Sequence, residues 1–288
     1  MGVKAEAGLP PRVTVRAPQP EDLAAMQDMC AELGLHTVCE EAHCPNRGEC
    51  YAAKTATFII LGNVCTRACH YCAIKHGRPL PPNPAEPAGV ARAIARLGLR
   101  YAVITSVTRD DLEDGGAGHF ARTIAEIRRA SPQTRIEVLV PDFRGDWAAL
   151  AEVVAAHPDV IAHNIETVPR LYRSVRPGAE YARSLSLLAT VRSLDPTVAT
   201  KSGVMVGLGE SDDELFAVMD DLVGAHCDIL TVGQYMAPGA KYHPVERFVS
   251  RATFDEYRRQ GLRRGFRYVA SGPLVRSSYL AEAALLGT

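Results

Sequence analysis

The placement of the cysteines is the feature that most restricts how this chain of 288 residues can fold. Six of its eight cysteines fall between Cys39 and Cys72, and only Cys30 and Cys227 lie outside that stretch. Small secreted chains use many cysteines for disulfides, but this chain is long, and residues 1–20 lack the apolar core of a signal peptide. We therefore expect the clustered cysteines to bind metal or to take part in redox chemistry.

One triplet, Cys65, Cys69 and Cys72, has C-x3-C-x2-C spacing and follows a short β-rich run at residues 57–61. Three thiolates on a tight loop can bind three irons of a four-iron cluster and leave the fourth iron open to another molecule. Structural metal sites are normally closed by four protein ligands, so the triplet favours a reactive cluster. The alternative is zinc, because His70 and His76 could complete a tetrahedral site.

The other triplet, Cys39, Cys44 and Cys50, has C-x4-C-x5-C spacing within residues 35–55. That stretch has little hydrophobic periodicity, so we expect a loop held by a second cluster rather than by a core. No fourth cysteine lies nearby. Cys30 and Cys227 are candidates, but each is better interpreted as a small apolar residue on a helix.

From residue 56 onward, strand-like and helix-like segments alternate. Strands are predicted at 57–61, 101–107, 135–140, 160–165, 202–207 and 229–235, with 268–271 as a further strand. Helices are predicted at 88–97, 120–129, 147–156, 182–194, 212–226 and 253–264, after a short helix at 21–33. This alternation implies a parallel sheet, and six clear strands are fewer than the eight of a closed barrel.

The fold class is therefore α/β, either a partial TIM-type (β/α)6 barrel or an open parallel sheet, and in both the functional site lies at the carboxyl ends of the strands. The barrel would span residues 56–266. An N-terminal extension, 1–55, and a C-terminal extension, 267–288, would cover its open end.

Composition argues against two classes of partner. The formal net charge is −1, so no bulk basic field favours nucleic acid. No apolar run approaches the roughly 18 residues of a membrane span. We expect a cytoplasmic protein without nucleic-acid or membrane partners.

The C-x3-C-x2-C loop after a first strand resembles the radical S-adenosylmethionine (SAM) superfamily, and the preceding C-x4-C-x5-C is similar to that of the lipoyl synthases. The similarity covers about residues 35 to 280. It continues, in order, through Ser106–Gly116, His163–Tyr172, Val175–Gly178, Thr200–Glu210, Thr231–Tyr235 and Ala270–Tyr279. Departures occur at Tyr51, where many members have tryptophan, and in residues 72–77 and 236–243, but none removes a cysteine of either triplet.

The resemblance implies a sulfurtransferase that inserts two sulfur atoms at carbons six and eight of a protein-bound octanoyl-lysine. It implies two [4Fe-4S] clusters and SAM. The cluster of Cys65, Cys69 and Cys72 would bind SAM and generate the radical that takes the substrate hydrogen. The auxiliary cluster of Cys39, Cys44 and Cys50 would donate sulfur. Its fourth ligand would be a serine of the Arg-Ser-Ser-Tyr sequence, Ser278 or, failing that, Ser277.

Five polar residues at or near strand carboxyl ends are candidate SAM contacts, although each could equally be a satisfied structural group. They are Ser106, Asn164, Glu166, Lys201 and Gln234. The glycine-bearing run Gly203–Glu210 could approach the adenosyl group or be a plain turn. Arg276 could orient the serine pair, contact substrate or be an ordinary surface arginine. His36, His43 and His119 are interpreted as structural.

The partners that the resemblance implies are octanoylated lipoyl carrier domains, reduced ferredoxin or flavodoxin, and an iron–sulfur carrier protein. The carrier domains include the glycine cleavage H protein and the acyltransferase subunits of 2-oxoacid dehydrogenases. One alternative is another two-cluster sulfur-inserting enzyme of the biotin synthase or methylthiotransferase type. The order of the triplets and the sequence at 276–279 argue against it. A zinc-stabilised binding protein without catalysis is the alternative from another class.

Overall fold

The computed structural model describes residues 17, 19–42, 44, 46–52 and 57–278. Its main sheet has eight strands in the order β1-β2-β5-β6-β7-β8-β9-β10, and the two outermost strands do not pair with each other. Strands β2 through β10 are parallel to their neighbours, whereas β1 is antiparallel to β2. The strands are β1 His36–Thr37, β2 Thr57–Ile60, β5 Tyr101–Ser106, β6 Arg135–Leu139, β7 Val160–Ala162, β8 Ala199–Val206, β9 Ile229–Gln234 and β10 Tyr268–Gly272.

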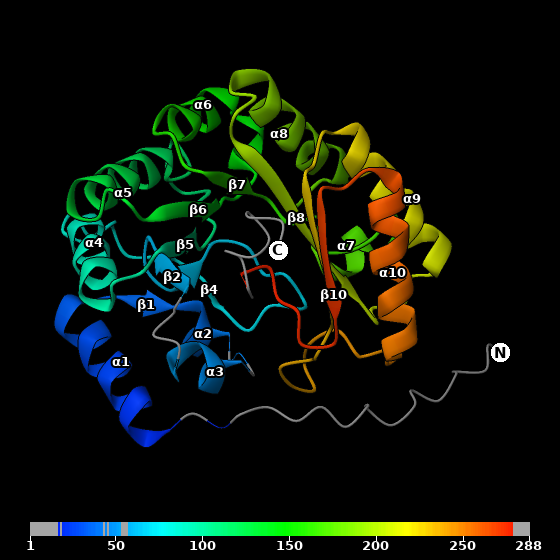
Figure 1. Cartoon of the computed structure of the whole chain (residues 1–288), viewed down its shortest axis with the longest axis horizontal. Helices are drawn as coiled ribbons and strands as arrows, with labels where there is room; N and C mark the ends of the chain where they lie inside the picture. The colour runs from blue at the N-terminus through cyan, green and yellow to red at the C-terminus, as the bar shows by residue number, and fades with distance from the viewer. Residues whose placement is uncertain (1–16, 18, 43, 45, 53–56, 279–288) are drawn as a thin grey trace.

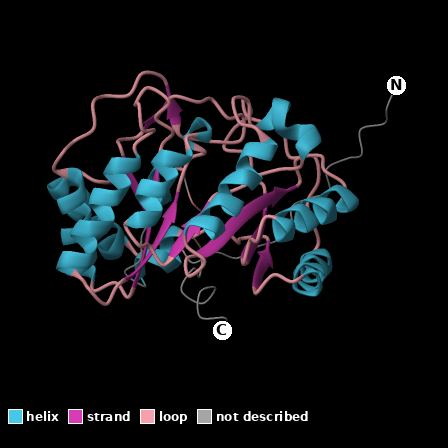
Figure 2. Ribbon diagram, turned by 90° about the horizontal axis from the view of Figure 1, so that it is seen from above, coloured by secondary structure: helices cyan, strands magenta, loops and turns pink. Residues whose placement is uncertain are grey.

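Helices cover the outer side of this open, curved sheet (Figure 1). Six of them follow β2 and the later strands: α4 Glu86–Leu97, α5 Ala117–Ala130, α6 Trp147–Ala155, α8 Tyr181–Leu194, α9 Asp212–Gly224 and α10 Arg251–Arg264. Figure 2 shows the strands in the interior with the helices around them. The predicted partial parallel barrel is therefore confirmed, and the predicted further strand is β10.

The core lies between the sheet and these helices. Phe120, Ile124 and Leu150 on the helices are fully buried, as are Ile104 and Val138 on the strands. Each such side chain contributes about 1.5–3 kcal/mol through removal of apolar surface from water. The alternating strand and helix periodicity of the sequence reflects this shared interior.

Three boundaries differ from prediction by three residues. Strand β8 begins at Ala199 rather than at residue 202, and β7 ends at Ala162 rather than at residue 165; beyond β7 only an isolated parallel bridge joins Glu166, whose φ is 68°, to Val204. Helix α5 begins three residues early, because the Asp114 carboxylate accepts hydrogen bonds from the amides of Gly116 and Gly118. The capping box of Ser211 and Glu214 starts α9, as its sequence indicates.

The N-terminal extension carries more regular structure than predicted. Helix α1, Pro20–Leu33, ends at Gly34 in a left-handed conformation, close to the prediction. The expectation of a loop throughout 35–55 was wrong, because Val38–Glu41 forms α2 and Arg47–Ala52 forms α3. Such helices are too short to produce a periodic pattern, and the Thr37 hydroxyl that caps α2 is a purely local signal.

The two extensions meet. The amide of Asn46 donates a hydrogen bond of 2.9 Å to the carbonyl oxygen of Leu274. The carbonyl oxygen of Val275 packs so closely on β9 that a Cβ built on Gly233 would lie 2.2 Å from it. Residues 273–278 therefore turn back from β10 toward the cysteine-bearing N-terminal extension. None of the helices in the described part of the chain has the length and apolar character needed to cross a membrane.

Candidate active site

The loop with the first cysteine triplet begins where β2 ends. Leu61 and Gly62 both have positive φ, which turns the chain out of the sheet at the carboxyl end of the strand. The loop then forms a two-residue parallel pairing between β3, Val64–Cys65, and β4, Lys75–His76. This places the triplet at the edge of the sheet where the sites of parallel α/β proteins form.

The thiols of Cys65, Cys69 and Cys72 lie close enough to influence one another and form no disulfide. Burial raises the pKa of Cys69 to about 11, and the neighbouring Cys65 adds to the effect while Arg176 opposes it. Burial likewise raises the pKa of Cys72 to about 12, with contributions from Cys69 and Cys65. Neighbouring thiolates repel one another, which is why Cys65 raises the pKa of both Cys69 and Cys72. Bound iron would offset this repulsion, because the thiolate is the form that ligates metal. Three converging thiols on one loop fit three irons of a four-iron cluster.

The second triplet also converges, although its members come from separate short elements. Cys39 lies in α2, Cys50 lies in α3, and Cys44 lies between them. Burial raises the pKa of Cys39 to about 12, and Cys44 and Cys50 contribute as like-charged neighbours. Across the described residues, no three His, Cys, Asp or Glu side chains are grouped as ligands of a single metal ion.

Arg276 brings the C-terminal extension to this second triplet. Burial lowers the pKa of Arg276, and the nearby Cys44 opposes that effect, so the two side chains lie near each other. The Arg276 guanidinium donates a hydrogen bond of 2.7 Å to the Val275 carbonyl oxygen. Ser277 and Ser278 follow directly and are partly buried. The ligand role of Ser278 stays a prediction.

Two of the predicted SAM contacts have a buried polar atom that finds no hydrogen-bond partner among the described residues. Ser106 Oγ lies at the carboxyl end of β5, and Asn164 Oδ1 lies just after β7. A Cβ built on Gly203 would lie 2.8 Å from Asn164 Oδ1 and 2.9 Å from Thr231 Oγ, so only glycine fits beside them. An unsatisfied buried polar group costs about 1–3 kcal/mol, and a bound ligand is one way to satisfy it. These orphaned atoms fit the binding of a polar cofactor.

Glu166 joins this region to the cysteine loop. Asn164 Nδ2 donates a hydrogen bond of 3.2 Å to its carboxylate, and the Tyr71 hydroxyl hydrogen-bonds to it as well. Burial raises the pKa of Glu166, with Arg176 acting in the opposite direction. Tyr71 directly precedes Cys72. Its hydrogen bond to Glu166 therefore links this carboxylate directly to the cysteine loop.

Lys201 and Gln234 have other partners. The Lys201 ammonium lies 2.8 Å and 3.0 Å from the two carboxylate oxygens of Glu137, in the amino-terminal half of β8. Gln234 donates to backbone carbonyls on three sides, and its Oε1 accepts from the Val249 amide. The structure thus gives both side chains structural partners, so we leave them out of the proposed cofactor site.

Two of the three histidines interpreted as structural lie beside carboxylates. The His119 ring lies 2.7 Å from the buried Glu86 carboxylate, and His36 lies 3.4 Å from Glu41. Cys30 is buried on α1, but Cys227 lies in the turn after α9 rather than on a helix. His43 is outside the described residues.

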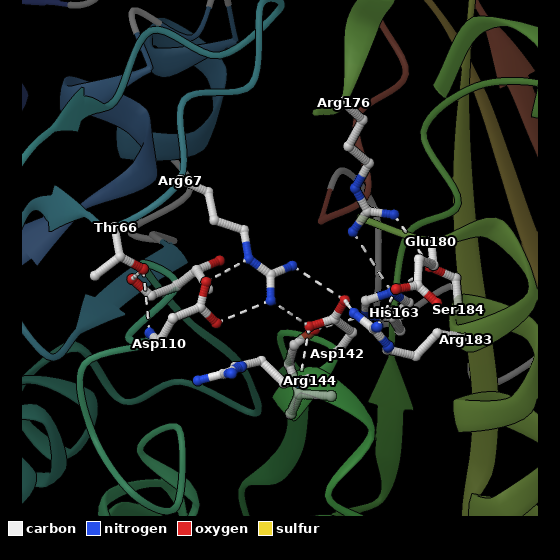
Figure 3. A network of polar contacts seen from close by, with 12 residues as sticks. Thr66, Arg67, Asp110, Asp142, Arg144, His163, Arg176, Glu180, Arg183 and Ser184 are labelled. Atoms are coloured by element: carbon white, nitrogen blue, oxygen red, sulfur yellow. Dashed lines mark hydrogen bonds and ion pairs between the residues drawn. The ribbon is translucent and has the colours of Figure 1, made fainter. Parts of the chain in front are cut away.

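Sequence reasoning missed the arginine inside the cysteine loop. Arg67 lies between the carboxylates of Asp110 and Asp142, which come from the loops after β5 and β6 (Figure 3). Asp110 belongs to the Ser106–Gly116 stretch that resembles the lipoyl synthases, which was its one available signal. No sequence signal indicated the pairing of Arg67 with Asp142, because these two residues are 75 positions apart.

Solved structures with a similar fold share little sequence with this chain. Methylornithine synthase aligns with a TM-score of 0.52 at 12% identity, over 77% of this chain and 73% of the other. HydG, a maturase of the [FeFe]-hydrogenase, aligns with a TM-score of 0.58 at 14% identity, over 74% and 49%. At these identities the likeness concerns the fold alone.

The sequence pattern of the radical SAM superfamily matches residues 59–222, and the chain belongs to that superfamily. A lipoyl synthase of Roseiflexus sp. is 54% identical over 273 residues, which cover 95% of this chain and 91% of the relative. A lipoyl synthase of Caldanaerobacter subterraneus subsp. tengcongensis is 53% identical over 280 residues, covering 95% and 98%. Within the superfamily, the chain belongs to the lipoyl synthase family.

Proposed function

We propose that this chain inserts two sulfur atoms at carbons six and eight of a protein-bound octanoyl-lysine, giving lipoyl-lysine. The observation that carries the proposal is the pair of cysteine triplets whose thiols lie near one another, the second of them near Arg276 of the C-terminal extension. The match to lipoyl synthases over 95% of the chain supports the same reaction.

Cys65, Cys69 and Cys72 would hold the first [4Fe-4S] cluster, and three protein ligands would leave one iron free to bind SAM. Cys39, Cys44 and Cys50 would hold the auxiliary cluster, with Ser278 as its fourth ligand and Ser277 as the alternative. When bound, the clusters and SAM supply the one-electron chemistry that breaks unactivated C–H bonds, together with the sulfur atoms, which no side chain could do.

The chain's own residues would bind and orient these groups. Asn164 Oδ1 can only accept a hydrogen bond, so it would face an ammonium or hydroxyl group of SAM. Ser106 Oγ can donate as well as accept. Glu166 would be held toward the same space by Asn164 and Tyr71. Arg276 would position Ser277 and Ser278 at the auxiliary cluster.

Each of the three segments of the chain would have its own role in the reaction. Residues 1–55 would carry the auxiliary cysteines, residues 56–266 would form the barrel, and residues 267–288 would supply the serine ligand. An octanoylated lipoyl carrier domain would present the substrate, either the glycine cleavage H protein or an acyltransferase subunit of a 2-oxoacid dehydrogenase. Reduced ferredoxin or flavodoxin would supply electrons, and an iron–sulfur carrier protein would rebuild the auxiliary cluster. The cytoplasm is the proposed location.

The test is anaerobic incubation with SAM, a reductant and an octanoyl-lysine peptide. The purified chain should contain about eight irons and should form 5′-deoxyadenosine together with a product that has gained two sulfurs. Cys44→Ala should abolish sulfur insertion and preserve deoxyadenosine formation. Cys227→Ala is the matched control, because this buried cysteine belongs to neither triplet. A colourless chain that holds only zinc would refute the proposal, and so would sulfur insertion by Cys44→Ala at the wild-type level.

A further inference from the structure

The Arg67 side chain holds the first cysteine loop from inside the fold. Its Nε and Nη2 donate to Asp110 at 2.7 Å and 2.9 Å. Its Nη1 and Nη2 donate to Asp142 at 3.0 Å and 2.7 Å. One guanidinium thus makes a two-pronged contact with each carboxylate, as Figure 3 shows. Arginine, and not lysine, has the planar donor geometry for such a contact. We call Arg67, Asp110 and Asp142 the clasp.

The clasp is buried. The Arg67 side chain is 9% exposed, that of Asp142 is 0% exposed, and that of Asp110 is 29% exposed. Burial alone would raise the pKa of Asp142, but the hydrogen bonds and charge of Arg67 hold it well below its usual range. Charge-assisted, two-pronged hydrogen bonds are the strong ones. Arg183 Nη1 also donates to Asp142 Oδ2, but through a single, longer contact of 3.3 Å, so loss of Arg67 removes most of the compensation of this buried charge.

The backbone after Asp142 is strained in a way that serves the clasp. Phe143 and Arg144 are not glycines, yet their φ values are 44° and 54°. The Arg144 amide in this turn donates a hydrogen bond of 3.1 Å to Asp142 Oδ1. Strained conformations persist where the surroundings over-determine them, and they gather at functional sites. The turn fixes the carboxylate that receives Arg67.

The clasp connects directly to a cysteine sulfur. The backbone amide of Arg67 donates a hydrogen bond of 3.4 Å to Cys65 Sγ. The preceding residue is fixed as well, because the Thr66 amide and hydroxyl both donate to the Thr108 carbonyl oxygen at 3.0 Å. With residue 66 and the residue 67 side chain both anchored, the orientation of this amide is set by the clasp.

We propose that Arg67 is a positioning residue, which keeps its amide hydrogen bond on Cys65 Sγ and thereby sets the reduction potential and the retention of the cluster. The inference rests on the proposed function only in taking Cys65, Cys69 and Cys72 as cluster ligands. The potential of an iron–sulfur cluster depends on hydrogen bonds to sulfur and on net charge. Outer residues that orient ligands typically change metal affinity or activity by tenfold to a hundredfold.

The test compares Arg67→Gln, Arg67→Lys and a matched control. The control is Arg170→Gln, because Arg170 makes the same two-pronged contact with Glu214, at 2.8 Å and 2.9 Å, but is 56% exposed. Each anaerobically reconstituted chain is titrated with reductant, and the potential is read from the electron paramagnetic resonance signal that changes when SAM is added. Iron release to a chelator is followed in parallel.

Arg67→Gln should move the potential to more negative values, because it removes a positive charge and loosens the amide on Cys65 Sγ. It should release iron about ten to a hundred times faster than the wild type. For Arg67→Lys, the potential and the rate of iron release should lie between those of the wild type and Arg67→Gln. The lysine ammonium keeps the positive charge but cannot make two-pronged contacts with both carboxylates. Arg170→Gln should match the wild type. A purely structural role for Arg67 would lower thermal stability without moving the potential.

An unchanged potential in a folded Arg67→Gln chain that contains its cluster would overturn the inference and leave the proposed function intact. A wild-type chain that takes up no iron would overturn both. If Arg67→Gln does not fold, Asp110→Asn decides the matter. It keeps the Asp142 contact and removes a negative charge, so the potential should move in the positive direction, and the absence of any shift would refute the clasp.

Discussion

The buried pair of Lys201 and Glu137 allows a sharp test of where the cofactor site ends. Both side chains are 1% exposed, and the Tyr101 hydroxyl donates a further hydrogen bond of 2.6 Å to the same carboxylate. Lys201→Met removes the ammonium and leaves the carboxylate buried without its counter-charge. Breaking a buried ion pair in this way costs about 3–5 kcal/mol. Replacing both partners with apolar residues removes the stranded charge and is often neutral or stabilising.

Anaerobic thermal unfolding and SAM binding should be measured on Lys201→Met and on the double variant with Glu137→Leu. The single variant should melt about 6–15 °C below the wild type, given roughly 2–3 °C per kcal/mol for a chain of this size. The double variant should recover most of the loss. SAM affinity should be unchanged in the double variant. A stable Lys201→Met chain that no longer binds SAM would refute our placement of this lysine outside the cofactor site.

Three other outcomes are expected. Asn164→Ala should weaken SAM binding by about five- to tenfold, as the loss of one hydrogen bond of about 1 kcal/mol or slightly more implies, measured by equilibrium binding; unchanged affinity would contradict the role of the orphaned Oδ1. Ser278→Cys should hinder turnover while the auxiliary cluster is retained, because a serine oxygen suits a soft iron site less well than thiolate and is more easily released; an unimpaired variant would refute this ligand role. Burial, with Arg176 in support, lowers the pKa of His163 to about 4, so the unfolded chain binds its proton first. Stability should therefore fall as pH decreases from 6.5 to 4, and His163→Gln should flatten that part of the profile by about 3 kcal/mol, measured by denaturant unfolding.

Local patterns in the sequence were sufficient to predict the order of strands and helices in the parallel sheet. The alternation of strands and helices is a local pattern, and β2 through β10 follow it because each strand and its next helix bury a common interior. The converging triplets are equally local, since Cys65, Cys69 and Cys72 occupy one loop. Ser106 and Asn164 were proposed as SAM contacts from position alone, as polar residues where strands end, and this role stays a prediction.

Sequence reasoning could not foresee pairings between side chains from separate segments of the chain. Lys201 and Gln234 occupy strand positions that could face a ligand, but their partners Glu137 and Arg247 are visible only in three dimensions. The same holds for Arg67 and Asp142. The short helices α2 and α3 were missed because four to six residues cannot display a helical period.

The hydrogen bond between Asn46 and Leu274 has a consequence for biosynthesis. Its two residues are separated by 228 positions, so at about 5–20 residues per second the ribosome needs roughly 10–50 seconds between them. During that interval Cys39, Cys44 and Cys50 have been synthesised, but Arg276, which lies near Cys44 in the folded chain, has not. The auxiliary site that we propose includes residues after β10, so it would be complete only after the last strand has been synthesised. A chain with a complete auxiliary site would therefore be one whose barrel has been synthesised in full.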